Sequence, residues 1–134
     1  MLIIVLFHGN QVVVAGGNGK GNQIDQLCGP SDVILDKNSG SLIISDRHNR
    51  RVVQWFRQNT KSRQVIISDI DCWGLTMDKD GYLYVSDTRK HEVRRFKMGD
   101  RSGVIVAGGN GQGHRLNQLN WPSSIFVDEE YSVY

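Results

Sequence analysis

The sequence predicts an all-β chain built from repeated four-stranded antiparallel units. Asp46 and Asp87 lie 41 residues apart, and in both copies a short apolar run precedes the aspartate and a second run, ending in an aromatic residue, follows it. A period near 40 residues is typical of stacked repeats. The apolar residues are consecutive rather than alternating, which is typical of strands whose two faces are both covered. Since every copy is strand-like, we predict a segment of a β-propeller, in which four-stranded blades pack face to face.

The composition is that of an ordinary globular domain. The chain has 134 residues, of which 39% are hydrophobic and 22% charged, and its formal net charge of +2 is too small to imply nucleic-acid binding by itself. No apolar run reaches the length of a transmembrane helix. The apolar run from Met1 to Phe7 lacks the cationic start of a secretory signal, so we predict a strand there. Two cysteines do not fix a compartment, and localisation stays open.

Apolar runs and turn residues place the strands. Asp80-Gly81 between two apolar runs predicts a tight hairpin turn, because glycine accepts the positive φ that such a turn requires, and Ser39-Gly40 predicts the corresponding turn one repeat earlier. The runs that we assign to strands are residues 2–7, 12–15, 33–36, 42–44, 52–56, 65–67, 75–78, 82–85, a run ending at Phe96, 125–128 and 132–134.

These strands divide the chain into units. Residues 1–27 are predicted to be the end of a preceding blade and a connector, 28–68 and 69–107 two blades, and 108–134 a connector and the start of a further blade. The pattern amounts to about half of a six-bladed ring, so we expect a piece of a longer protein. A homodimer that completes the ring is a further expectation, because open end blades expose an unpaired edge.

A glycine-rich loop occurs twice, at residues 16–21 and 108–113. It lacks the Gly-Lys-Ser/Thr ending of a phosphate-binding loop, and no helix pattern follows it, so we interpret it as a connector that uses positive φ angles. A tail ending in leucine and then a proline, Pro30 or Pro122, follows each copy.

The repeated segment resembles the NHL-repeat family, whose blades carry a signature like Asp-x-x-Asn-His-Arg-Val. The first copy matches at Asp46, Asn49, Arg51 and Val52, and the second at Asp87, His91 and Val93. Lys90 and Glu92 replace the asparagine and arginine in the second copy. The resemblance implies a propeller fold and a structural role for the signature.

We predict that six residues serve the repeat structure. A carboxylate at the end of a strand accepts the amides of the turn that it opens, and an arginine at the start of the next strand lies close enough to pair with it. These structural residues are Asp46, Arg51, Asp87, Asp36, Asp78 and Asp128.

A candidate binding surface follows from the strand order. When the strands of a blade are named a to d outward, the b–c turns and the d–a connectors lie on one rim. Basic residues with nearby aromatics on such a rim can hold a protein segment or single-stranded RNA. The residues of this predicted rim are Arg47, His48, Asn49, Arg50, Arg89, Lys90, His91, Trp73 and Trp121.

The sequence predicts neither a metal site nor a cofactor. The four histidines lie at unrelated blade positions, Asp78 to Gly81 lacks the distal glutamate of a calcium loop, and Cys28 and Cys72 are predicted to be free thiols. We predict no enzyme. Propeller lactonases and lyases carry metal ligands on inner strands, and the corresponding positions Asp32, Gly74 and Ser124 form no repeated ligand set.

The preferred function is a protein-interaction platform with an unidentified protein partner. The alternatives are single-stranded RNA binding through the same rim, and the substrate-recognition part of a larger ubiquitin ligase, a role that some family members have. A fragment of a propeller lactonase or lyase is less favoured.

Overall fold

The computed structural model describes residues 2–7, 10–56 and 62–134. Met1, residues 8–9, which include His8, and residues 57–61 lie outside the described residues. No helix in this part of the chain is both long enough and apolar enough to span a bilayer.

Strands dominate the described residues, with one 3-10 helix, η1 (Arg47–Asn49). The strands are β1 (Leu2–Phe7), β2 (Asn10–Gly16), β3 (Asp32–Asp36), β4 (Ser41–Asp46), β5 (Arg51–Phe56), β6 (Arg63–Ser68), β7 (Cys72–Met77), β8 (Leu83–Asp87), β9 (Glu92–Phe96) and β10 (Val104–Gly108).

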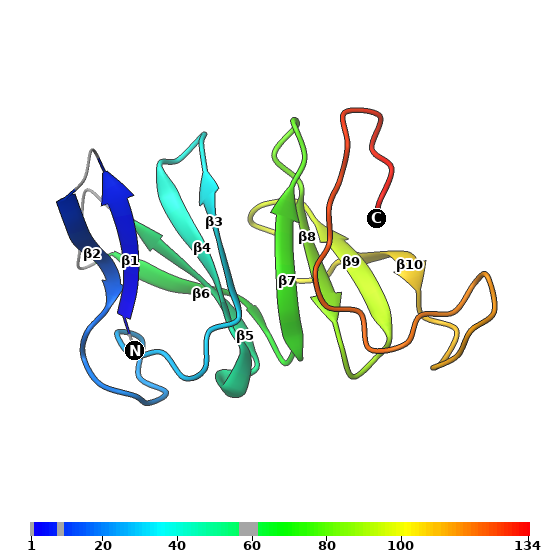
Figure 1. Cartoon of the computed structure of the whole chain (residues 1–134), viewed down its shortest axis with the longest axis horizontal. Helices are drawn as coiled ribbons and strands as arrows, with labels where there is room; N and C mark the ends of the chain where they lie inside the picture. Colours follow the sequence, from blue (N-terminus) through cyan, green and yellow to red (C-terminus); the bar gives the residue numbers. More distant parts are fainter. Residues whose placement is uncertain (1, 8–9, 57–61) are drawn as a thin grey trace.

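The strands form one antiparallel pair and two four-stranded antiparallel sheets, which stand side by side (Figure 1). The pair is β1–β2, and the sheets have the orders β3-β4-β5-β6 and β7-β8-β9-β10, so each follows the chain in a simple meander. After β10 the chain forms a short hairpin with a bridge between Val127 and Val133. The predicted all-β class and the four-stranded antiparallel units are confirmed.

An aspartate organises the turn of each inner hairpin. Asp78 Oδ1 accepts the amides of Asp80 and Tyr82, both at 3.0 Å, while Gly81 takes a φ of +85°. Asp128 repeats this arrangement with the amides of Glu130 and Ser132. A short carboxylate that satisfies turn amides in this way explains why each hairpin turns directly after its aspartate.

Packing between neighbouring sheets supplies the core. Ile43 and Val52 from one sheet and Leu75 and Val85 from the next belong to one buried apolar cluster, and β3 and β7 are in contact. Ala15 and Leu27 pack on the other side of the first sheet, against a cluster that includes Trp55. The two central strands of the first sheet, β4 and β5, are therefore covered on both faces, as their consecutive apolar residues require.

The turns and connectors separate onto two edges (Figure 1). The connector 17–31, η1, the β8–β9 turn 88–91 and the connector 109–124 lie along the lower edge in this view, and the β3–β4 and β7–β8 turns lie along the upper one. We call the lower edge the connector rim. The η1 and β8–β9 turns connect strands b and c of the two complete sheets.

The two cysteines are free thiols in different environments, and this difference predicts their reactivity. Cys72 is fully buried in the cluster between the sheets, and this burial raises the pKa of its thiol to about 11. Because the thiolate is the reactive form, Cys72 is almost entirely in its unreactive form at pH 8. Cys28 is only half-buried.

We expect iodoacetamide at pH 8 to modify Cys28 before Cys72 in the folded protein, with Cys72 reacting readily only in denaturant. Peptide mass spectrometry of samples taken over time measures both rates. Equal rates for the two thiols in the native protein would contradict the packing described here.

Candidate functional site

A buried aspartate lies at the centre of the connector rim. Asp46 ends β4 and is 0% exposed. Its Oδ1 accepts the amide of Cys28 at 2.7 Å, and its Oδ2 accepts the side-chain amide of Asn49 at 2.8 Å and Nε of Arg51 at 2.7 Å. A fully buried carboxylate is stable only when it is hydrogen-bonded and paired in this way.

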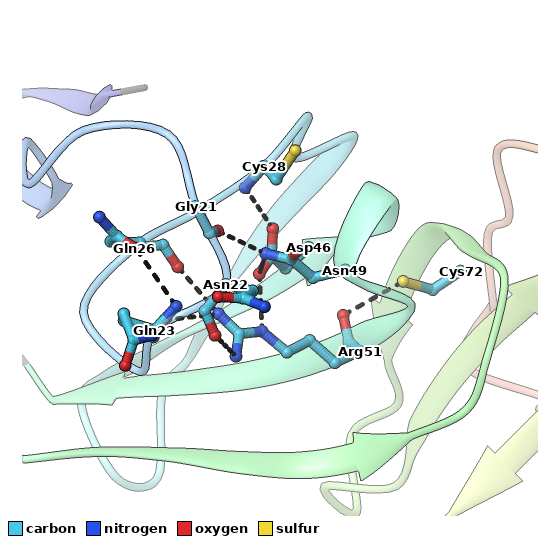
Figure 2. A network of polar contacts seen from close by, with 9 residues as sticks. All are labelled: Gly21, Asn22, Gln23, Gln26, Cys28, Asp46, Asn49, Arg51 and Cys72. Atoms are coloured by element: carbon cyan, nitrogen blue, oxygen red, sulfur yellow. Dashed lines mark hydrogen bonds and ion pairs between the residues drawn. The ribbon is translucent and has the colours of Figure 1, made fainter.

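Arg51 carries this network across to the connector (Figure 2). Its guanidinium donates to three backbone carbonyls, those of Asn22 at 3.0 Å, Gln23 at 2.8 Å and Gln26 at 2.9 Å. The side chain is 11% exposed and also pairs with Asp46. Since one guanidinium has five N–H donors in a rigid plane, a single residue fastens the connector to the β4–β5 turn.

The second repeat replaces this network with a different one. Asp87 Oδ1 accepts the turn amides of Arg89 at 3.1 Å and Lys90 at 3.0 Å. Glu92 stands opposite Asp87 in the strand register, where Arg51 stands in the first repeat, and it pairs with Arg94. Asp87 therefore holds its own turn, and among the described residues it forms no ion pair with a guanidinium.

The last residue of each b–c turn adopts a left-handed conformation and reaches the next connector. Arg50, with a φ of +52°, pairs with Asp69 at 2.9 Å and with Asp71 at 3.2 Å. The hydrogen bond to Asp71 raises the pKa of Arg50 above its ordinary value. His91, with a φ of +54°, occupies the corresponding position of the second repeat.

His91 makes its contact through its ring and its carbonyl. Its Nδ1 accepts the amide of Trp121 at 3.1 Å, its carbonyl accepts the amide of Gly109 at 3.1 Å, and its ring meets that of Trp121 edge-on with centroids 5.2 Å apart. The imidazole of His91 therefore holds the connector that follows the second sheet. After the first sheet, the ion pairs of Arg50 with Asp69 and Asp71 make the corresponding contact.

The two tryptophans of the predicted rim differ in exposure. Trp73 is half-buried, and the guanidinium of Arg47 lies 3.9 Å from the centroid of its ring. Trp121 is 59% exposed and has a φ of +51°. The corresponding residue of the first connector is Gly29, with a φ of +56° and the ring of His48 so close that a Cβ would lie 2.5 Å from it. A bulky residue in this conformation is strained by on the order of 1–3 kcal/mol.

Two further cations of the predicted rim point outward. Arg89 and Lys90 are exposed, and within the described residues neither forms an ion pair. Beside Lys90 a cavity of about 200 Å³ opens. It is smaller than the cavities of roughly 300 Å³ and above that hold small-molecule ligands, so it suits a side chain better than a metabolite. Its lining includes Ile70, Asp87, Lys90, Arg94 and Arg101.

The structure thus divides the predicted rim residues into two groups. The side chains of Asn49 and Arg50 make hydrogen bonds or ion pairs with other residues of the chain, and His48 packs on Gly29. Arg47 with Trp73, His91 with Trp121, and the cations Arg89 and Lys90 remain as candidates for contact with a partner. Their binding role stays a prediction.

Two acidic residues of the connector rim were not predicted from the sequence. Asp69 and Asp71 neutralise Arg50, and nothing in the repeat pattern marks them, because the connector between β6 and β7 is shorter than the other two. Among the described residues no group of three or more histidine, cysteine or acidic side chains is arranged to hold a metal ion.

Comparison with known proteins identifies the fold. No protein-family model matches the chain, and no curated protein matches it. Similar solved structures include a streptogramin B lyase, with a TM-score of 0.59 and 9% identity over 92% of this chain and 36% of that one. A catalytically inactive virginiamycin B lyase from Staphylococcus aureus, solved with quinupristin, has a TM-score of 0.60 and 11% identity over 97% of this chain and 46% of that one. The fold is that of a β-propeller.

The chain spans less than half the length of either lyase. Identities of 9% and 11% establish the shared fold and nothing about activity.

The different surroundings of two adjacent arginines predict different effects on stability. Replacing Arg51 by alanine leaves the buried Asp46 carboxylate without its cation and removes the guanidinium donor from three connector carbonyls, of which that of Gln23 keeps the amide of Gln26. We expect Arg51→Ala to lower the free energy of unfolding by about 3–5 kcal/mol. Arg50→Ala, the matched control, removes exposed ion pairs and should cost much less. Urea unfolding followed by fluorescence measures both, and equal losses for the two variants would contradict the role assigned to Arg51.

Proposed function

We propose that this propeller segment is a non-catalytic binding module whose connector rim docks a protein partner. The observation that carries the proposal is Trp121. Its ring is 59% exposed, and its backbone is held in a left-handed conformation where the first connector has glycine. Strained residues cluster at binding and catalytic sites, and exposed tryptophans are frequent hot spots of protein interfaces.

The contacts of Trp121 support a rigid anchor. The hydrogen bond from its amide to His91 Nδ1 and the edge-on contact of the two rings fix the tryptophan relative to the β8–β9 turn. A side chain that is already ordered loses little conformational entropy when it binds. Arg89 and Lys90, in the same turn as His91, add charges that can select an acidic partner surface.

Charge compensation favours protein over RNA as the partner. Asp69 and Asp71 neutralise Arg50, so one of the arginines of the predicted rim is paired within the chain. Single-stranded nucleic acid requires a continuous positive groove together with stacking platforms. Arg89 and Lys90 lie in one short turn, and Arg47 lies over the ring of Trp73, so these cations are not a continuous groove.

The enzymatic alternative comes from the fold neighbours, which are lyases of streptogramin B and virginiamycin B. The shared fold alone supports it. We propose that this chain lacks such activity, and that any NHL-type or ubiquitin-ligase context belongs to a longer parent protein.

The test compares rim variants with a variant of the opposite edge. Trp121→Ala should weaken capture of the partner by about 30-fold or more, the size expected for a hot spot. Arg89→Ala with Lys90→Ala should weaken it less and slow association. The control is Lys37→Ala in the β3–β4 turn, which should bind like the wild type. Quantitative affinity capture from cell extract followed by titration with the purified partner gives the affinities.

Labelled single-stranded RNA is titrated in parallel. RNA binding that weakens steeply with salt and disappears when Arg89 and Lys90 are replaced would overturn the protein-platform proposal. Loss of the protein partner in Lys37→Ala but not in Trp121→Ala would overturn the assignment of the rim.

A further inference from the structure

The cavity beside Lys90 lies between the two complete sheets. One wall is residues 67–70, at the end of β6 and in the connector that follows it. The other wall comes from the second sheet and its turns, and consists of Asp87, Lys90, Arg94, Phe96 and Arg101. Both sheets have all four of their strands, so the cavity is a property of the junction between them.

A difference in connector length explains why the cavity is open. Residues 17–31 connect β2 to β3 before the first sheet, whereas only residues 69–71 connect β6 to β7 before the second. The long connector covers the first sheet, because Leu27 belongs to one buried cluster with Val53 and Trp55. The short connector has no stretch that could cover the second sheet in the same way.

The strand register shows that the cavity lies over the corresponding surface of the second sheet. Arg94 occupies in β9 the place that Val53 occupies in β5. Phe96 likewise occupies the place of Trp55. Both Arg94 and Phe96 line the cavity. The cavity therefore lies where the first repeat has Leu27 and the backbone beside it.

The residue under this position changes from apolar to cationic between the repeats. Val53 is 1% exposed and packs in the cluster that contains Leu27. Arg94 pairs with Glu92 through its Nε, and among the described residues its two terminal nitrogens have no acceptor. A segment that lies over Arg94 as Leu27 lies over Val53 therefore gains most from an anionic side chain, since arginine binds carboxylates with two parallel N–H donors.

The other charges of the cavity also favour an anion. Asp69 pairs with Arg50 at 2.9 Å. Lys90 and Arg101 form no ion pair within the described residues. These two cations face one further carboxylate, that of Asp87, whose Oδ1 accepts two turn amides. One negative charge balances this set, so a carboxylate suits it better than a phosphate monoester, which carries about −1.5 to −2.

The second oxygen of Asp87 indicates that the occupant is a polypeptide. Asp87 is 1% exposed, and within the described part of the chain no donor reaches its Oδ2. In the first repeat, the connector donates the amide of Cys28 to Asp46 at 2.7 Å. A buried carboxylate oxygen requires such a donor. A backbone amide can supply it, whereas a free carboxylate such as acetate carries no N–H group.

We propose that this cavity receives an extended segment of a partner protein whose aspartate or glutamate carboxylate contacts Lys90, Arg94 and Arg101. A backbone amide of the same segment donates to Asp87. Recognition of acidic motifs by clustered arginines is a recurring mode of peptide binding. The inference rests on the proposed function, because Lys90 belongs to the connector rim. Trp121 does not line the cavity, so docking at the rim and the acidic contact can fail separately.

The test titrates the full chain with a labelled peptide of residues 20–28 that carries Leu27→Glu and Cys28→Ser. This sequence is the probe because it covers the equivalent surface of the first sheet, and the new carboxylate replaces the side chain that lies over Val53. By fluorescence anisotropy, we expect it to bind about 10-fold or more tightly than the matched peptide that keeps Leu27. Amide NMR shifts should be confined to residues 67–70 and 87–94. A Leu27→Arg peptide should bind no better than the Leu27 peptide.

Variants of the chain test the cavity itself. Lys90→Ala with Arg101→Ala should weaken binding of the Leu27→Glu peptide by about 10-fold or more. Arg94→Val introduces the residue of the first repeat and should reverse the preference, so that the Leu27 peptide binds more tightly. The control is Lys97→Ala, an exposed cation that does not line the cavity, which should bind like the wild type. Because Lys90 and Arg101 are exposed, their variant keeps the test valid if Arg94→Val is poorly folded.

Four results would overturn the proposal. These are no binding of the Leu27→Glu peptide up to about 1 mM, equal binding of the Leu27 or Leu27→Arg peptide, and an unchanged affinity in Lys90→Ala with Arg101→Ala. The fourth is tighter binding, by about 10-fold or more, of a peptide with phosphoserine at position 27, which would assign the cavity to phosphate. Partner capture that Trp121→Ala abolishes but the Lys90 and Arg101 variant leaves intact would overturn this inference and retain the proposed function.

Discussion

The pairing of Arg51 with Asp46 and with the connector carbonyls is the interaction on which the connector rim depends. Asp46 is fully buried, and a carboxylate in that position requires a cation and several hydrogen bonds. Arg51 supplies the cation and uses its remaining donors on three carbonyls that a loop without regular secondary structure would otherwise expose. The position of the connector then places Leu27 in the apolar cluster with Trp55. One side chain thereby couples a turn, a connector and part of the core.

The second repeat keeps the fold while it changes the residues at these contacts. Glu92 replaces the arginine and pairs with Arg94, and His91 fastens the following connector through Trp121. The contacts that hold a blade therefore vary between repeats, whereas the sheet order and the turn aspartates do not. This freedom has a functional consequence. Under the proposed function, the exposed ring of Trp121 is the group that this variation makes accessible to a partner.

Much of the fold follows from the sequence because it depends on short-range patterns. Consecutive apolar residues, Asp80-Gly81 and the repeated glycine loops are local signals, and they correctly predict strands, hairpins and four-stranded units. The pairing of Arg51 with Asp46 was also within reach, since the two residues face each other across one turn. The contacts with Asn22, Gln23 and Gln26 were not, because they depend on how a long connector folds back over the blade.

The rim was harder to predict than the fold for an electrostatic reason. The predicted rim includes Arg50 as a surface charge, but Asp69 and Asp71 compensate it in space. Similarly, Trp73 and Trp121 look alike as tryptophans that precede an inner strand, and only the structure separates the half-buried ring from the exposed one. The left-handed backbone of Trp121 has no sequence signal, because glycine would be expected at such a position.

Amide hydrogen exchange at Gly21 and Gly113 tests the central claim most directly. Both amides donate to the carbonyl of a leucine, at 3.3 and 3.2 Å, in connectors of the same internal architecture, but only the first connector is held by Arg51. The account predicts slower exchange at Gly21 than at Gly113 in the wild-type chain, and a loss of this difference in Arg51→Ala. Equal exchange at the two glycines in the wild type, or a difference that survives the substitution, would contradict it.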